Sequence, residues 1–173
     1  APKLGGIESV MTNIATQSSK IGHGVSVLAD GSKSKTLSFD NQQNFEVKRF
    51  DQIKFFRNMI KSSFANDLLK NKNFDLIFFD SWKSLEHFNN TTQIKKICLI
   101  HGNEILNLKK KVRIIKSLKK IDKILFNSNF TKNLFYKQLP ELNDIPSMVI
   151  FPAFIENINY TYDEKKYDLC TIA

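Results

Sequence analysis

Apolar positions along this chain switch between the spacing of a helix and the spacing of a strand. They recur every three or four residues over 7–21 and 52–70, which predicts two amphipathic helices. Apolar runs over 25–29 and 74–79, and an alternating run over 45–50, predict three strands. The apolar face of the second helix is predicted to consist of Ile53, Phe56, Ile60, Phe64 and Leu68.

The same switching continues through the second half of the chain. The elements predicted there are, in order, a strand over 96–100, a helix over 104–120, a strand over 123–126, a short helix over 130–138 and a strand over 147–151. Strands and helices that alternate at this spacing predict an α/β fold with a doubly wound, Rossmann-like parallel sheet. The run 74–79 fits the interior of such a sheet, because it is apolar except at Asp75.

Both ends of the sequence have the character of cut points. The first residues form a loop that leads straight into the helix over 7–21, with no strand before it. The polar stretch 156–166 has the composition of a linker, and a strand pattern begins at 167 and runs to the last residue. We therefore expect an N-terminal domain over 1–155, and a linker with the start of a truncated second domain over 156–173.

The composition is that of an ordinary soluble globular domain. Of the 173 residues, 42% are apolar and 25% are charged. No apolar run approaches the roughly 18 residues that cross a bilayer, and the first residues lack the basic start and apolar block of a signal peptide. Cys98 and Cys170 each lie in an apolar run, without a second ligand at metal-binding spacing. They are expected to be reduced, buried thiols of a cytoplasmic protein.

The net charge of +9 is concentrated in one predicted helix, where seven basic residues and no acidic one lie between 109 and 120. Its apolar stripe consists of Ile105, Leu108, Val112, Ile115 and Leu118. Such a block indicates nucleic acid, anionic lipid or a phosphorylated ligand as the partner. The helix itself is either a solvated helix that covers the sheet or a helix that docks on anionic lipid. Leu106 and Ile114 lie off the stripe, which favours contact with a membrane. The candidate membrane-facing residues are Lys109, Lys110, Lys111, Arg113, Lys116, Lys119 and Lys120.

Gly5 and Gly6 stand immediately before the first predicted helix. Glycines allow the backbone to approach a ligand closely, and the free N–H groups of a helix start favour an anion. The pair fits a phosphate site, and a plain tight turn is the other interpretation. The sequence here matches neither Gly-x-Gly-x-x-Gly nor the Walker pattern. Glu8, in the first helical turn, either stabilises the helix start or contacts the acceptor or the loop backbone.

Two predicted strands end in polar side chains. His101 and Gly102 follow the strand over 96–100, and open α/β sheets bind ligands at the carboxyl ends of their strands. An imidazole can donate a hydrogen bond to a sugar hydroxyl or to developing phosphate charge, whereas a strand-end histidine also serves purely structural roles. Ser128 and Asn129 stand between a strand and a helix, where N-capping is the simplest role.

Six segments carry a further signal in their order along the chain. They are Pro2-Lys3-Leu4-Gly5-Gly6-Ile7-Glu8, Gly22-His23-Gly24-Val25, Phe74-Asp75-Leu76-Ile77, Ile100-His101-Gly102-Asn103-Glu104, the run 121–131 that contains Ser128, and Val149-Ile150-Phe151-Pro152-Ala153. In this order they resemble the N-terminal, Rossmann-like half of a GT-B glycosyltransferase of the retaining family 4 (group 1).

The resemblance implies an activity and a site. The full-length protein is expected to transfer a sugar from a nucleotide-sugar donor to a saccharide or lipid-linked acceptor with retention, as a hexosyltransferase-like enzyme. The family pattern makes His101 the catalytic candidate, near the transferred sugar and its phosphate. The residues expected at the donor phosphate or the acceptor are Gly5, Gly6, Glu8, Gly102, Ser128 and Asn129. His23 is expected only to shape the turn before the second strand.

No metal and no cofactor are expected. The chain has no Asp-x-Asp motif, so metal-bridged diphosphate chemistry is not indicated, and the nucleotide sugar is a substrate. The resemblance assigns an arginine and a lysine of the second domain to the charge of the leaving group. The fragment alone is therefore expected to be inactive.

The expected setting is surface polysaccharide synthesis, such as that of lipopolysaccharide or capsule. The expected location is the cytoplasm, with peripheral binding to the inner face of the cell membrane. The alternative function is a non-catalytic Rossmann module that binds a glycan or a nucleotide. Nucleic-acid binding is not expected, because the basic segment comes with no recognition module and the aromatic-rich strands have the pattern of core.

Overall fold

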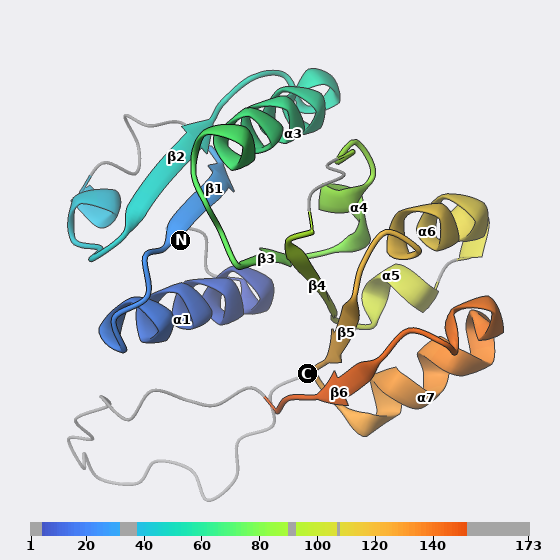
Figure 1. Ribbon diagram of the computed structural model, residues 1–173. Helices are drawn as coiled ribbons and strands as arrows, with labels where there is room; N and C mark the ends of the chain where they lie inside the picture. The colour runs from blue at the N-terminus through green and yellow to red at the C-terminus, as the bar shows by residue number, and fades with distance from the viewer. Residues whose placement is uncertain (1–4, 32–37, 90–92, 107, 152–173) are drawn as a thin grey trace, which may run out of the picture.

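The computed structural model describes residues 5–31, 38–89, 93–106 and 108–151 (Figure 1). Its elements are α1 (Gly6–Lys20), β1 (Ser26–Asp30), β2 (Glu46–Phe50), α3 (Lys54–Asn71), β3 (Leu76–Phe79), α4 (Trp82–Leu85), β4 (Lys95–Ile100), α5 (Asn103–Leu106), η1 (Leu108–Lys110), α6 (Lys111–Leu118), β5 (Lys123–Phe126), α7 (Asn129–Gln138), η2 (Pro140–Leu142) and β6 (Ser147–Val149). The expected linker, the expected last strand and Cys170 lie outside the described residues.

All paired strands of the described chain are parallel, and the helices between them supply the crossover connections that parallel strands need. β1 pairs with β2, and the other strands form a four-stranded sheet in the order β3-β4-β5-β6. The α/β prediction is confirmed. The described strands nevertheless form two sheets instead of the single expected one, because β1 and β3 do not pair with each other.

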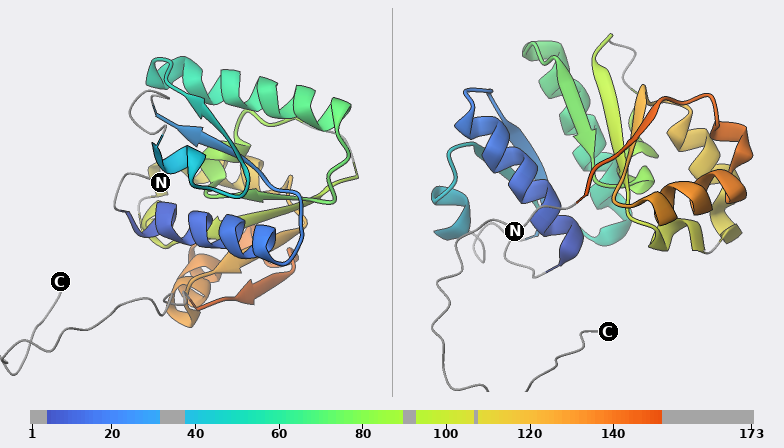
Figure 2. Two further views of the ribbon diagram at one scale, coloured as in Figure 1. Left: turned by 90° about the vertical axis from the view of Figure 1, so that its left-hand side faces the viewer. Right: turned by 90° about the horizontal axis from the view of Figure 1, so that it is seen from below.

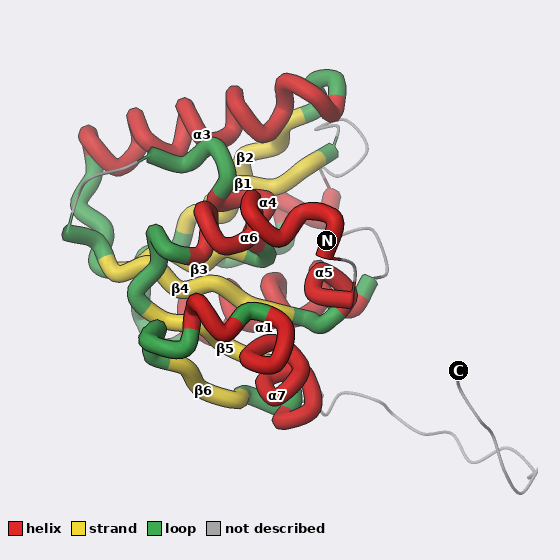
Figure 3. The backbone as a smooth tube through the Cα atoms, turned by 90° about the vertical axis from the view of Figure 1, so that its right-hand side faces the viewer, coloured by secondary structure: helices red, strands yellow, loops and turns green. Residues whose placement is uncertain are grey.

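The helices lie on two sides of the strands (Figure 1). α1 lies on one side, and α4 to α7 lie on the other. Figure 3 is seen from the side of α4 to α7, with the strands behind them. The left view of Figure 2 shows that α1 begins at the edge of the molecule where the strands end. That edge therefore brings together the first helix start and the loops that follow β4 and β5.

The main core lies between the four-stranded sheet and the helices α4 to α7. Cys98, Ile124 and Phe126 from the two central strands are buried against Leu118 and Phe135 from the helices. Phe126 and Phe135 meet edge to face, with ring centroids 5.1 Å apart. Burial raises the pKa of the Cys98 thiol well above its ordinary value, and the charges of Asp80 and Glu104 add to the effect. Cys98 is free and buried, as predicted.

The basic segment is not the single helix predicted over 104–120. It is divided into α5, η1 and α6, because the backbone leaves helical geometry at Lys110, with φ −112° and ψ 18°. The break rotates the second part of the segment relative to the predicted stripe. Ile114, expected off the stripe, is buried, whereas Val112, expected on it, is 79% exposed. Leu106 is exposed, as expected.

The predicted apolar face of α3 is also wrong in its first half. Phe56 and Ile60 are exposed, and Ile53 lies before the helix at 77% exposure. The side chains that α3 buries are the small ones of Ser62 and Ala65. Small side chains let a helix approach its neighbours closely, so they decide which face turns inward. Among the described residues, no helix has the length and apolar character that a membrane span needs.

Candidate functional site

The carboxyl ends of β4 and β5 place two polar side chains next to each other. Ile100 and Phe126 are paired in the parallel register of these strands. The residues that follow them, His101 and Asn127, therefore leave the sheet side by side. Sequence reasoning selected His101 but missed Asn127, although Asn127 stands directly after an apolar strand in the same way.

The main chain of His101 is held on both sides. Its N–H donates to Glu104 Oε1 at 3.0 Å, and its carbonyl accepts from Asn127 Nδ2 at 3.3 Å. Main-chain groups that leave a strand need such partners, because unpaired buried amides are costly. The imidazole Nε2 and Asn127 Oδ1 are buried and make no hydrogen bond to any described residue. The loop is thus fixed while two polar atoms keep their hydrogen-bonding capacity.

Gly102 has φ +108°, in the region that favours glycine. It was expected to lie at the donor phosphate or the acceptor. A Cβ there would meet only the Thr131 side chain, at the ordinary contact distance of 3.5 Å. The glycine is therefore required by backbone conformation, which turns the chain from β4 into α5.

Ser128 is the N-cap of α7. Its Oγ accepts the N–H of Thr131 at 3.1 Å and donates to Thr131 Oγ1 at 3.0 Å. Asn129 is the first residue of the helix and is exposed. The structure supports the capping interpretation for Ser128. Thr131, which sequence reasoning missed, connects this cap to the turn at Gly102.

The glycine loop at α1 is more open. Gly5 is the N-cap, its φ of −147° is extended, and no side chain caps the helix. A Cβ on Gly5 would collide with the carboxylate of Glu8, whereas a Cβ on Gly6 would meet nothing. Glu8 is exposed, and its carboxylate lies beside Gly5 at the helix start without making a capping hydrogen bond. Of the two glycines, only Gly5 would force a neighbour to move if it carried a Cβ, and that neighbour is the exposed side chain of Glu8.

This arrangement of glycine loop, strand-end histidine and parallel strands agrees with the comparison to known families. The family model named Glycosyltransferase Family 4 matches residues 4–150, which is most of the chain. The chain belongs to glycosyltransferase family 4. It is a glycosyltransferase-type domain of the N-terminal kind. The search of curated proteins found no match to the chain.

In this family 4 domain, three of the candidate membrane-facing residues bind other groups of the protein. Lys111 pairs with Glu141 at 2.9 Å. Arg113 binds Glu86 through two hydrogen bonds, which lower the pKa of that carboxyl. Arg113 also lies over the ring of Trp82, 5.8 Å from its centroid.

Lys120 is the third of them. Its Nζ donates to the carbonyls of Leu85, Glu86 and Phe88 at 3.0 to 3.3 Å, and desolvation lowers its pKa. The role that the structure gives Lys120 is to satisfy the carboxyl end of α4. The exposed stripe of α6 and the residue after it consists of Val112, Lys116 and Lys119. These three are spaced at four and three residues, so they share one helix face.

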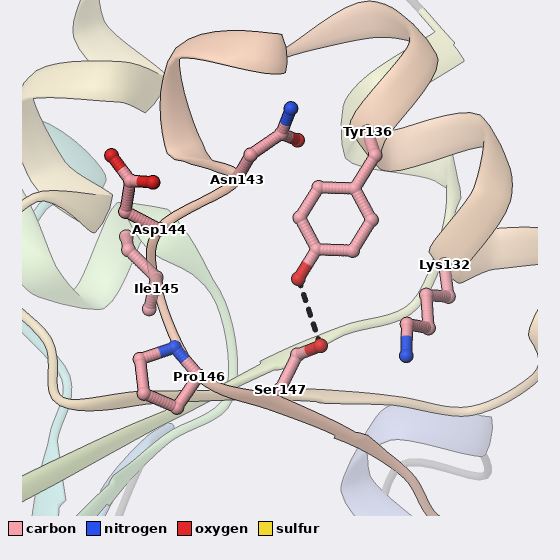
Figure 4. A pocket seen from close by; sticks show the side chains of 7 residues that line it. All are labelled: Lys132, Tyr136, Asn143, Asp144, Ile145, Pro146 and Ser147. Carbon is pink, nitrogen blue, oxygen red and sulfur yellow. Dashed lines mark hydrogen bonds between the residues drawn. The ribbon is translucent and has the colours of Figure 1, made fainter.

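One hollow of the described domain lies away from these residues. It measures about 470 Å³ between α7 and the start of β6, where the Tyr136 hydroxyl donates to Ser147 Oγ at 2.8 Å (Figure 4). Ser147 begins its strand, so the hollow borders the amino end of β6. None of the predicted site residues lines it. In the described ranges, no three His, Cys, Asp or Glu side chains gather as metal ligands.

Proposed function

We propose that this family 4 domain is the acceptor-side half of an enzyme that transfers a sugar from a nucleotide-sugar donor to a saccharide or lipid-linked acceptor, with retention. The bond from the anomeric carbon to the phosphate oxygen breaks, and a bond to the acceptor hydroxyl forms on the same face of the sugar. The proton of that hydroxyl leaves with the nucleoside diphosphate. The observation that carries the proposal is the fixed main chain of His101 at the sheet edge.

His101 is the residue proposed to contact the reacting sugar. An imidazole held in place donates to a sugar hydroxyl or to the charge that develops on phosphate, without reorganising during the reaction. The clamp by Glu104 and Asn127 supports this role, because it orders the backbone on both sides of the ring. The open start of α1, at the same edge, favours the negative charge of the donor phosphate (Figure 2).

We propose that the rest of the donor site belongs to a second domain. Cationic side chains there would neutralise the leaving diphosphate without a metal ion, and the nucleotide sugar would be a substrate, with no cofactor needed. Gly5, Gly6 and Glu8 would approach the donor phosphate or the acceptor from this domain. Gly102, Ser128 and Asn129 would border the same cleft through the turns that they form.

The test is turnover by the complete polypeptide that carries this domain, across a panel of nucleotide sugars. His101→Ala is expected to lower kcat/KM by at least about a hundredfold, the usual contribution of a positioned imidazole. His87→Ala is the matched control, because His87 is exposed and lies outside the site. Equal turnover in both variants would remove His101 from the mechanism. Glycan or nucleotide binding without any turnover would favour the non-catalytic module.

We further propose that the exposed stripe of Val112, Lys116 and Lys119 docks the domain on the inner face of the cell membrane, for surface polysaccharide synthesis. Each basic residue near an anionic surface contributes about 1 kcal/mol. Flotation with phosphatidylglycerol vesicles is expected to recover the protein, whereas pure phosphatidylcholine vesicles leave it in solution. Equal recovery with both kinds of vesicle contradicts electrostatic docking.

A further inference from the structure

A second, smaller cavity lies close to the His101 loop. It measures about 190 Å³ and is lined by Trp82 and Lys83 of α4, Glu104 of α5, and Lys109 and Lys110 of η1. α4 follows β3 and α5 follows β4, so the cavity borders the edge where these strands end. Glu104 joins it to the His101 site, because the same carboxylate accepts the His101 N–H. Lys109 and Lys110 were predicted to face a membrane, and the structure places them at this cavity.

The lining of the cavity is cationic. It contains three ammonium groups and one carboxylate, which leaves a formal charge of +2. Lys83 and Lys110 are exposed and form no salt bridge with a described residue. The nearby charge of Arg113 is balanced by Glu86. Lysines of this kind bind phosphate oxygens as mobile point charges.

Trp82 supplies a second, independent sign of a ligand. Its side chain is 2% exposed, and its indole Nε1–H is buried without an acceptor among the described residues. Leaving a buried donor unpaired costs free energy that an incoming oxygen atom would recover. Trp82 lines the cavity, so a ligand bound there lies against the residue that carries this donor.

The size of the cavity limits the class of ligand. Its volume is about six times the ~30 Å³ that a water molecule occupies in the liquid. That space holds a phosphoryl group with its oxygens, and the rest of a larger ligand would lie outside it. We propose that the cavity between α4 and η1 is a phosphoryl-binding site, which takes the phosphate of the acceptor beside the His101 loop. The assignment to the acceptor rests on the proposed function, whereas phosphoryl binding itself does not.

The one tryptophan of the sequence gives a direct measurement of binding. The first arm titrates the protein with soluble diphosphate and follows the fluorescence of Trp82. The second arm uses phosphatidylcholine vesicles that contain phosphatidic acid, whose phosphate is a monoester, or phosphatidylserine, whose phosphate is esterified on both sides. A saturable change with diphosphate identifies a free phosphate, and a change only with phosphatidic acid identifies a lipid phosphate. Both results support the site.

Matched variants separate the cavity from general surface charge. Lys83→Ser with Lys110→Ser is expected to weaken the diphosphate response at least about tenfold, as loss of one charge-assisted hydrogen bond does. Lys116→Ser with Lys119→Ser removes the same charge outside the cavity and is expected to change it less than about twofold. Glu104→Gln, which keeps an oxygen for the His101 N–H, is expected to tighten binding. In the vesicle arm, only the first pair is expected to abolish the fluorescence change of vesicle-bound protein.

The outcomes that overturn the site are distinct from failure of the proposed transferase. No fluorescence change with diphosphate or with phosphatidic acid overturns it, and so does an equal loss in the two double variants. A response to phosphatidylserine equal to that with phosphatidic acid also overturns it, because surface charge then explains the binding. None of these measurements uses turnover or a nucleotide sugar, so they test phosphoryl binding independently of the proposed transferase activity.

Discussion

Two helix starts lie at the same edge of this domain and are built in different ways. The start of α1 has two glycines, no side-chain cap and an exposed Glu8. The start of α7 has a serine cap, and the loop before α5 is held by Glu104 and Asn127. The start of α1 is easier to recognise in the sequence, whereas the start of α7 and the loop before α5 are held by more hydrogen bonds. A conspicuous motif thus does not identify the best-ordered part of a site.

The largest expected difference between the two regions concerns their glycines. Gly102→Ala forces an L side chain into φ +108° and is expected to lower the free energy of unfolding by about 1–3 kcal/mol. Gly6→Ala puts a methyl group into open space on a helix, and is expected to leave stability unchanged or raise it by up to about 1 kcal/mol. Urea unfolding measures both. Equal destabilisation by the two variants contradicts the contrast.

A second pair of variants tests the clamp of His101. Asn127→Ala removes the donor to the His101 carbonyl and is expected to cost about 1–1.5 kcal/mol of unfolding free energy. Asn129→Ala, at the exposed first residue of α7, is the control and is expected to cost less than about 0.5 kcal/mol. The NMR signals of the His101 ring should broaden only in the first variant. Unchanged His101 signals in Asn127→Ala would count against the clamp.

At the start of α1, a weaker coupling is expected between Gly5 and Glu8. Gly5→Ala is expected to displace Glu8, at a cost of a few tenths of a kcal/mol through the lost interaction with the helix start. In a Glu8→Ala background the same change is expected to cost nothing, because the side chain that it displaces is gone. A double-mutant cycle in urea measures this coupling. Purely additive effects mean that Gly5 and Glu8 act independently.

The smallest effect concerns the ion pair that joins α4 to α6. The Arg113 hydrogen bond lowers the pKa of Glu86 below its ordinary value of 4.5. The resulting stabilisation is complete above the unfolded-state pKa, and it is lost as the pH falls through the lower folded-state pKa. Glu86→Gln is therefore expected to be slightly less stable than the parent at pH 7 and equal to it near pH 2. A difference that grows in acid contradicts this sign.

Much of the fold follows from the sequence, because burial imposes its period on the chain. The predicted strand over 123–126 has the bounds of β5, and the helix over 7–21 corresponds to α1. The α4 turn escaped prediction, because four residues are too few to show a helical period. The break at Lys110 escaped it too, since the lysines there favour a helix and tertiary packing of Ile114 and Leu118 decides otherwise.

The candidate site was predictable only in part. His101 was predicted from its place after an apolar strand and from the family pattern. Asn127 stands directly after another apolar strand, so the same rule would have selected it. The role of Lys120 was not readable, because it depends on three carbonyls more than 30 residues away in sequence. The local pattern predicts which residues reach the sheet edge. Only the folded chain shows which side chains already have hydrogen-bond partners within the protein.

The parallel pairing of every described strand also determines how this domain assembles. Ser26 pairs with Glu46, Leu76 with Lys95, and Ile97 with Lys123, at sequence separations of 20, 19 and 26 residues. No hairpin is available to start these ladders, so each closes only after the loop entropy of its intervening segment has been lost. Helices should form and collapse first, and the sheet should zip up against them. During synthesis, β4 remains unpaired on its β5 side until β5, which follows α6, has been made.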